Sequence, residues 1–478
     1  MSSVKKNFLY NIFYHILTFI IPLILSPYLS RVIHAKGIGI YSYTYSIVYY
    51  FMLLTLLGVN NYGNRTIAKV RDDKTKLSKT FWSIYLMQLI MGIIMLILYF
   101  GYIFIFNIEY RTIALIQSLF ILSSILDINW FFWGMEEFKK TIGRNTIVKI
   151  LNAIMIVLIV RNDNDLWKYA LIMGVMTCIS QLILWIYIRK YINIEKIMFV
   201  DIKNHFKPNI VLFIPVIAVS LYKIMDKIML GSLANVTEVG YYENAEKIIN
   251  MPMTLITALG TIMIPKISNL SSKGEIKKIK EYINKSENFV MFVSFAMCFG
   301  LIGIGYHFAP FFFGKYFQKT GLLIMLLATT LPFLAFANVL RTQFLIPREK
   351  DKIYIKSVFL GAITNLIMNF IFIPIYKSIG ACIGTIMAEF IVMFYQAFAI
   401  RKELPIKDYL LKSIPFFIKS LVMLALIYPL NYIKMNSLIR LILQISLGSV
   451  TYVLLNFKYI YSLIDVKKIM KKFHPKKN

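Results

Sequence analysis

Long apolar stretches alternate with short polar connections along almost the whole chain. Each stretch has the roughly twenty apolar residues that an α-helix needs to cross the hydrocarbon core of a bilayer. The pattern therefore predicts an all-α integral membrane protein with about 14 transmembrane helices and no separate soluble domain. The predicted spans cover residues 8–29, 40–58, 81–106, 112–134, 145–160, 167–188, 209–230, 248–265, 288–308, 320–340, 357–375, 380–400, 413–430 and 437–456.

Composition agrees with this class. The 478 residues are 58% hydrophobic and only 16% charged, whereas about a quarter of the residues of a soluble domain are charged. The three cysteines, Cys178, Cys298 and Cys382, all lie in apolar stretches. They are typical of small core side chains rather than of a disulfide framework or a metal site.

The net charge of +30 could indicate a nucleic-acid partner. Lys and Arg, however, are concentrated in the connections 61–80 and 266–287 and in the tail after residue 456. All three lie on one side if the N-terminus is inside, which is the bias of the positive-inside rule. We therefore predict that the N- and C-termini are both cytoplasmic. Membrane topology and attraction to anionic lipid headgroups therefore account for most of the +30, and no nucleic-acid partner is needed.

Local self-similarity recurs at fixed offsets and predicts a six-span unit used twice, with two spans appended. Six spans return the chain to its starting side, so the copies are parallel and a substrate cavity is expected between two lobes. The predicted divisions are 1–207, 208–402, and 403–478 with the basic tail. The matched pairs are Gly39 with Gly240, Tyr41 with Tyr242, Met135-Glu136 with Arg348-Glu349, and Asn152 with Asn365.

Four degenerate motifs are distributed over nearly the whole chain. They are Arg31–Tyr41, Gly58–Asp72, Trp130–Lys139, and Asp226–Gly231 with Val239–Ile248. Together with spans arranged as six, six and two, the set resembles the multidrug/oligosaccharidyl-lipid/polysaccharide exporter superfamily. Within it, the chain is most similar to the polysaccharide (O-antigen and capsule repeat-unit) flippases. It departs from the family pattern at Ile33-His34, where Leu-Gly is common.

The resemblance implies a flippase that moves undecaprenyl-pyrophosphate-linked oligosaccharide repeat units across the cytoplasmic membrane by alternating access, for surface polysaccharide biosynthesis. It implies no ATP hydrolysis and no cofactor. The partners it implies are membrane lipids, a coupling ion (H⁺ or Na⁺) and other polysaccharide-assembly proteins. The sequence has no Walker loop, no metal-spaced cluster and no catalytic set, which favours a transporter over an enzyme.

Ionisable side chains inside the spans are the candidate binding residues, because each costs about 2.5–3.5 kcal/mol to insert at a bilayer centre. Lys223, Asp226 and Lys227 lie within one turn of each other in the seventh span. They predict a cationic patch for the pyrophosphate, since a lysine ammonium is a compact charge with three donors. The alternative is that the three side chains snorkel to the outer interface.

Three further charges are candidates. Arg31, at the outer end of the first span, is either a headgroup anchor or a cavity cation. Asp127, in the fourth span, must be paired, protonated or hydrated, and is a candidate partner of a cavity cation or a coupling-ion site. Arg341 closes the tenth span on the cytoplasmic side, where it either receives the incoming pyrophosphate or anchors the helix.

Two other functions remain open at this stage. A cation-coupled multidrug exporter of the same superfamily would need an acid-lined cavity, and the candidate charges here are mainly basic. A membrane-bound polysaccharide polymerase or transferase would need a long or carboxylate-rich outer loop. The longest outer connection, 231–247, is short.

Overall fold

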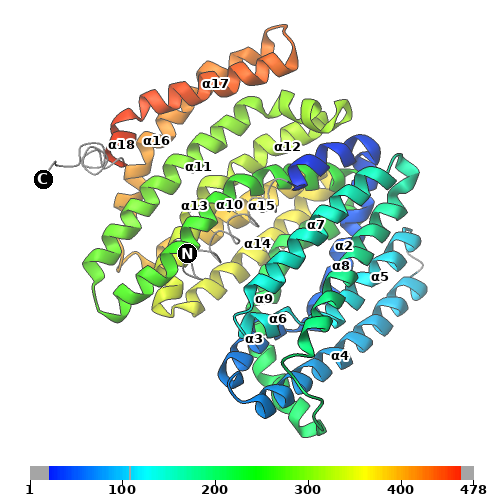
Figure 1. Ribbon diagram of the computed structural model, residues 1–478. Coiled ribbons are helices and arrows are strands. Elements are labelled where there is room, and N and C mark those ends of the chain that lie inside the picture. Colours follow the sequence, from blue (N-terminus) through cyan, green and yellow to red (C-terminus); the bar gives the residue numbers. More distant parts are fainter. Residues whose placement is uncertain (1–20, 107–108, 464–478) are drawn as a thin grey trace, which may run out of the picture. The chain divides into compact units, whose positions relative to one another are not determined.

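The computed structural model describes residues 21–106 and 109–463, and these ranges contain helices and connections but no strand (Figure 1). Residues 21–32 are helical. The helices that follow are α2 (His34–Leu56), α3 (Val59–Val70), α4 (Lys74–Ile105), α5 (Arg111–Ile125), α6 (Asn129–Gly134), α7 (Phe138–Ile159), α8 (Leu166–Ile188), α9 (Phe199–Leu233), α10 (Val236–Ser272), α11 (Ile276–Phe313), α12 (Gln318–Ala328), α13 (Thr330–Leu340), α14 (Asp351–Tyr376), α15 (Ser378–Ile400), α16 (Ile406–Ile427), α17 (Ser437–Leu455) and α18 (Phe457–Leu463).

Within the described residues, eleven helical segments are long and apolar enough to cross a membrane. A bent pair, Lys315–Ala328 with Thr330–Arg348 at 41°, would make twelve. The predicted all-α membrane class is confirmed. The count of fourteen stays a prediction, because most of the first predicted span, 8–29, lies outside the described residues and the seventh, 209–230 in α9, is not among these helices. The end of the basic tail lies outside the described residues too.

Several helices are longer than the apolar stretches that predicted them. Helices α10 and α11 have 37 and 38 residues. At 1.5 Å per residue each is about 55 Å long, against about 30 Å of hydrocarbon. Hydropathy detects only the part of a helix that suits lipid, whereas backbone hydrogen bonds continue the helix into the polar region.

Two predicted spans are broken helices. The stretch 112–134 forms α5 and α6, and the stretch 320–340 forms α12 and α13. At the first break, the Asp127 carboxylate accepts a hydrogen bond from the backbone N–H of Asn129 at 2.8 Å. Because that N–H has no partner within its own helix, the side chain supports the start of α6.

The helices cluster into two compact units. The first runs to Glu243 and includes Asn369–Ala381, and the second combines Asn244–Met368 with the residues from Cys382 onward. Helices α10, α14 and α15 therefore contribute to both units. This grouping follows packing, whereas the division at residues 207 and 402 follows the sequence repeat. The latter stays a prediction.

The first unit has an aromatic core beneath α3. Trp130, Phe131 and Phe81 are fully buried there, and the Trp130 ring stacks on Phe81 with centroids 5.5 Å apart. The indole N–H of Trp130 donates to Oε1 of Gln88 at 3.1 Å. The aromatic motif at 130–133 therefore forms packing that holds α6 against α3 and α4.

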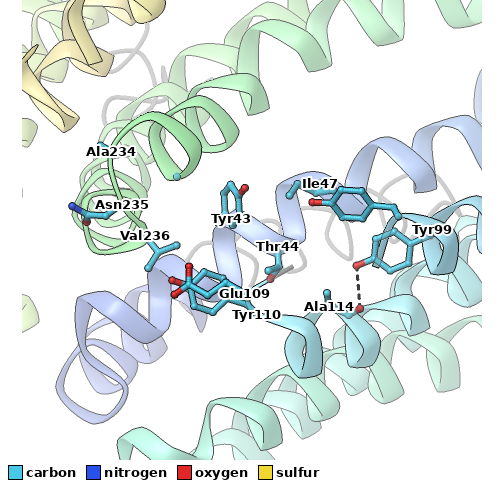
Figure 2. Close-up of a pocket in the computed structure, with 12 residues that line it drawn as sticks. Tyr43, Thr44, Ile47, Tyr99, Glu109, Tyr110, Ala114, Ala234, Asn235 and Val236 are labelled. Carbon is cyan, nitrogen blue, oxygen red and sulfur yellow. Dashed lines mark hydrogen bonds between the residues drawn. The ribbon is translucent and has the colours of Figure 1, made fainter. Parts of the chain in front are cut away.

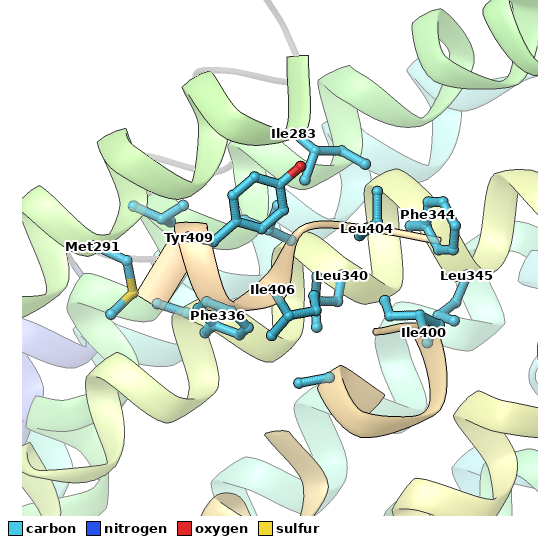
Figure 3. Packing of buried hydrophobic residues seen from close by; sticks show 14 of the residues in the cluster. Ile283, Met291, Phe336, Leu340, Phe344, Leu345, Ile400, Leu404, Ile406 and Tyr409 are labelled. Carbon is cyan, nitrogen blue, oxygen red and sulfur yellow. The ribbon is translucent and has the colours of Figure 1, made fainter. Parts of the chain in front are cut away.

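The second unit has an aliphatic and aromatic core shared by α11, α13 and the segment from the end of α15 into α16 (Figure 3). Phe336 and Ile283 are fully buried in it, and Tyr409 is nearly so. Since these side chains come from three segments distant in sequence, burial of this cluster fixes the helices of the unit against one another.

The second repeat match corresponds to one backbone conformation adopted twice. Glu136 and Glu349, which are 213 residues apart, both have left-handed φ angles, of 60° and 56°. The N–H of Glu137 donates to the carbonyl of Phe132, and the N–H of Lys350 donates to that of Leu345, both at 2.9 Å. These pairs keep the same offset. The local similarity is therefore structural as well as sequential.

Candidate functional site

The site in the first unit depends on a close crossing of α2 and α10. A Cβ atom on Gly39 would lie 1.6 Å from the carbonyl oxygen of Val236, and one on Gly240 would lie 1.9 Å from that of Ala35. Only glycine allows two helix backbones to approach so closely. The crossing sets the start of α10 against α2 and hence positions Tyr242 and Glu243.

Lys227 and Glu243 form an ion pair across the α9–α10 hairpin. The Lys227 ammonium lies 2.6 Å from Oε2 of Glu243, and the two side chains are 16% and 15% exposed. Two opposite charges this close and this little hydrated attract strongly. Lys227 is therefore balanced by a carboxylate in this conformation.

Asp226, the neighbour of Lys227, is buried and accepts hydrogen bonds from two other helices. The Tyr242 hydroxyl donates to Oδ2 at 2.8 Å, and the Asn369 amide donates to Oδ1 at 2.6 Å. Each oxygen of this buried carboxylate therefore has a hydrogen-bond donor. Asp226 thus ties α9 to α10 and to the end of α14. The side chain of Lys223 lies outside the described part of the structure.

Tyrosines surround the ion pair. Tyr41 stacks on Tyr45 with ring centroids 5.9 Å apart and lies 4.6 Å from the ring of Tyr169. All three rings are within electrostatic range of Glu243. The site therefore combines a cation, a carboxylate and aromatic rings, which is chemistry suited to phosphate and sugar groups.

Asp127 belongs to a different polar cluster in the same unit, around the buried guanidinium of Arg144. Asn129 donates to Oδ1 of Asp127 at 2.6 Å and accepts from Nη2 of Arg144 at 2.9 Å. Arg144 also donates to the carbonyl of Ser180 at 3.0 Å. The cluster links α6, α7 and α8, and it places Asp127 near a cation through one amide.

The two remaining predicted cations come from other segments of the chain. Arg31, exposed on helix 21–32, donates to the carbonyl of Pro27 at 3.1 Å. Arg341 follows α13 in the second unit, with its guanidinium 5.7 Å from the ring centroid of Tyr354. Among the predicted site residues whose side chains are described, Asp226 and Lys227 lie side by side in the sequence of α9.

Sequence reasoning did not select Glu243, Tyr242, Asn369 or Arg144. A signal existed for the first two, because residues equidistant from the α9–α10 turn face each other in a helical hairpin. Asn369 is 143 residues from Asp226, and no short-range pattern connects them. Arg144 fell at the edge of a predicted span, where it was indistinguishable from an interfacial anchor.

Comparison with known proteins identifies the family. The family described as "Polysaccharide biosynthesis protein" matches residues 4–271, more than half of the chain. The chain belongs to this family. The resemblance that the four motifs predicted is confirmed.

A curated relative matches along its whole length. The chain is 23% identical over 404 residues to a putative O-antigen transporter of Shigella dysenteriae, covering 83% of this chain and 100% of the relative. Among solved structures, the lipid II flippase MurJ in an inward closed conformation has a TM-score of 0.75 at 20% identity, covering 96% of this chain and 99% of the other.

An inward-facing multidrug resistance MATE family transporter of the MOP superfamily has a TM-score of 0.59 at 12% identity, covering 82% and 98% of the two chains. At these identities the two structural likenesses establish the fold, which the family shares with transporters of different cargo. They do not distinguish among substrates.

Proposed function

We propose that this protein is a flippase that translocates undecaprenyl-pyrophosphate-linked oligosaccharide repeat units across the bacterial cytoplasmic membrane for surface polysaccharide biosynthesis. The observation that carries the proposal is the family match, together with similarity over the full length of a putative O-antigen transporter. The proposed route is alternating access between lobes 1–207 and 208–402, with both termini in the cytoplasm. Membrane lipids and polysaccharide-assembly proteins are the proposed partners.

In this mechanism the charge of Lys227 has two successive partners. The first is Glu243, which lies 2.6 Å from the ammonium in the structure. A pyrophosphate group carries more negative charge and more acceptor oxygens than a carboxylate, so it can replace Glu243 as the partner. The exchange keeps a cation available inside the membrane without leaving it unpaired, which would be costly.

Energy input is proposed to come from a coupling ion, H⁺ or Na⁺. Asp226 and Asp127 are the carboxylates of the predicted set. Asp226 has the better position to link an ion to helix movement, because Tyr242 on α10 and Asn369 on α14 both donate to it. Arg31 and Arg341 are proposed to guide the anionic substrate at the outer and cytoplasmic ends, respectively.

The proposal is tested in cells that lack the gene. Deletion is expected to abolish surface polysaccharide and to accumulate lipid-linked oligosaccharide on the inner leaflet, and the unmodified gene is expected to reverse both effects. Complementation with Lys227→Ala should fail, whereas Lys458→Ala, at an exposed position of α18, should succeed. Normal polysaccharide in the deletion strain would refute the flippase assignment. Drug sensitivity with unchanged polysaccharide would favour the multidrug exporter instead.

A further inference from the structure

A polar cavity lies in the first unit beside the α4–α5 and α9–α10 turns, and neither Lys227 nor Glu243 is among its lining residues (Figure 2). Its volume is about 370 Å³. This falls at the small end of ligand sites, about 300–1,000 Å³, which is the scale of one or two sugar rings. Both turns are on the outer side in the proposed orientation.

Tyrosines dominate the wall of this cavity. Tyr43, Tyr99, Tyr102 and Tyr110 all line it, and Figure 2 shows Tyr43, Tyr99 and Tyr110 around the same space. Tyrosine rings present flat apolar faces, and their hydroxyls form hydrogen bonds. That combination matches a sugar, whose ring has apolar C–H faces and a rim of hydroxyls.

The tyrosines are held in place by the fold. Tyr43 is fixed against the end of α9, where its hydroxyl lies 3.2 Å from that of Ser232 and its ring fills the space beside Gly231. The Tyr99 hydroxyl donates to the carbonyl of Ala114 at 3.0 Å. Two walls of the cavity are therefore set before any ligand arrives, which lowers the entropic cost of binding.

Charge decides which ligand class suits the cavity. Glu109 is its one acidic lining residue, and no Lys or Arg is among the described residues that line it. Burial, together with the adjacent Glu109 carboxylate, raises the pKa of Tyr110 to about 12. A carboxylate repels phosphate and accepts strongly from hydroxyl groups. The cavity therefore disfavours pyrophosphate and favours an uncharged ligand rich in hydroxyls.

We propose that this cavity is a subsite for an uncharged pyranose of the glycan on the outer side, with Glu109 accepting sugar hydroxyls and Tyr102 covering a ring face. The proposal rests on the proposed flippase function. It assigns recognition of the sugar to α4, α5 and the α9–α10 turn, away from the residues that would hold the pyrophosphate.

Binding of free sugars tests the subsite without requiring transport. The probes are the methyl glycosides of glucose, galactose and N-acetylglucosamine, with glycerol 3-phosphate as an anionic comparison. Saturation transfer from protein to ligand is measured by NMR on the full chain in phospholipid nanodiscs. Sugar-based detergents are excluded because their headgroups would compete for the cavity.

Two variants remove the proposed contacts: Glu109→Gln alone, and Glu109→Gln with Tyr102→Leu. The matched control is Asp163→Asn with Tyr432→Leu, which changes an exposed acid and an exposed tyrosine on other turns. All three variants must unfold at the same temperature as the unmodified protein. Since Glu109→Gln is nearly isosteric, it keeps the test interpretable if the double variant unfolds early.

At least one neutral glycoside should receive saturation from the unmodified protein and from the control. Its affinity should fall roughly tenfold in Glu109→Gln, the loss expected for one charge-assisted hydrogen bond. Equal signals in the pocket variants and the control would overturn the proposal. So would the absence of binding by all neutral glycosides, or stronger binding of glycerol 3-phosphate. Failure of the flippase function would instead appear in the polysaccharide assay.

Discussion

Gly39 and Gly240 meet through a reciprocal backbone contact in which each glycine faces the residue four positions before the other. Gly39 faces Val236, and Gly240 faces Ala35. The two contacts are related by the same 201-residue offset that matched the glycines in the sequence. The motif therefore identifies residues that touch, although the sequence comparison indicated only that they are equivalent.

Replacing either glycine at this crossing should be poorly tolerated. In Gly39→Ala, the new Cβ would need to lie 1.6 Å from Val236 O, so α2 and α10 must separate. Overpacking of this kind costs about 1–3 kcal/mol. We expect a lower unfolding temperature in a fluorescence-based thermal assay and loss of polysaccharide in complementation.

The control for the crossing is Gly143→Ala in α7, where an added Cβ meets nothing within 4 Å. Alanine is the better helix former by about 0.5–1 kcal/mol. This variant should unfold at the same temperature as the unmodified protein or slightly higher. A Gly39→Ala variant that behaved like Gly143→Ala would contradict the close approach.

The Lys227–Glu243 pair predicts opposite effects of single and double substitutions. Lys227→Met removes the ammonium that lies 2.6 Å from the Glu243 carboxylate and should destabilise the protein by up to roughly 3 kcal/mol. Lys227→Met with Glu243→Leu should recover most of that stability, because an apolar pair fits a poorly hydrated position. Thermal unfolding in nanodiscs measures both.

A complementation assay separates the contribution of the Lys227–Glu243 pair to stability from its contribution to transport. If Lys227 receives the pyrophosphate, the double variant should be stable yet unable to restore surface polysaccharide. A comparison pair is Asp73 with Lys76, which are much more exposed; replacing Lys76 by methionine should leave the unfolding temperature almost unchanged. Full polysaccharide output from the stable double variant would remove Lys227 from the mechanism.

Asp226 should be sensitive to the loss of either donor. Tyr242→Phe removes a hydrogen bond to a buried carboxylate and should cost about 1–3 kcal/mol in unfolding free energy. Tyr461→Phe, at an exposed ring, should have no measurable effect. Equal unfolding temperatures for the two variants would show that the 2.8 Å contact between Tyr242 and Asp226 contributes nothing.

The left-handed residue Glu349 provides a test of backbone conformation. Glycine adopts a φ of 56° without steric cost, whereas a β-branched side chain adopts it poorly. Glu349→Gly should therefore change the unfolding free energy little, and Glu349→Val should lower it by about 1–2 kcal/mol. A valine variant as stable as the glycine variant would be inconsistent with this turn.

His205, near the start of α9, leads us to predict a pH dependence of stability. Its Nδ1 lies 2.7 Å from the Tyr62 hydroxyl, and burial lowers its pKa below 6.5 despite the nearby Asp201. A lowered pKa means that the unfolded chain binds the proton more readily than the folded one. Stability is therefore fully present above about pH 6.5 and falls as the pH drops towards the folded pKa.

The measurement is the unfolding temperature of the protein in nanodiscs between about pH 7.5 and pH 5, compared with that of His205→Asn. The asparagine keeps a polar group near Tyr62 but does not titrate in this range. The decline at low pH should be smaller in the variant. Identical pH profiles would show that His205 is not the group responsible.

Hydropathy predicted nearly every helix that is long and apolar enough to cross a membrane, because a helix in lipid must be mostly apolar. It missed the breaks at Asp127 and Thr329, which depend on local hydrogen bonds and not on apolarity. The site was predicted in part. Asp226 and Lys227 were visible as charges in an apolar stretch, but their partners Asn369 and Glu243 were not.

The difference has a physical cause. A charge inside a span is detectable locally, whereas the group that neutralises it is chosen by tertiary packing. Arg144 shows the same limit, because its burial among Asn129 and Ser180 depends on how α6, α7 and α8 assemble. The tyrosine-lined cavity was equally hidden, since each tyrosine alone suits an interfacial belt.

The reciprocal crossing has the geometry of a homodimer interface, in which every substitution acts twice. The two sides of this crossing differ in charge, because the positions 201 residues before Asp226 and Lys227 are Leu25 and Ser26. Within a single chain, a reciprocal contact can therefore carry a charged pair on one side alone, which two identical subunits could not do.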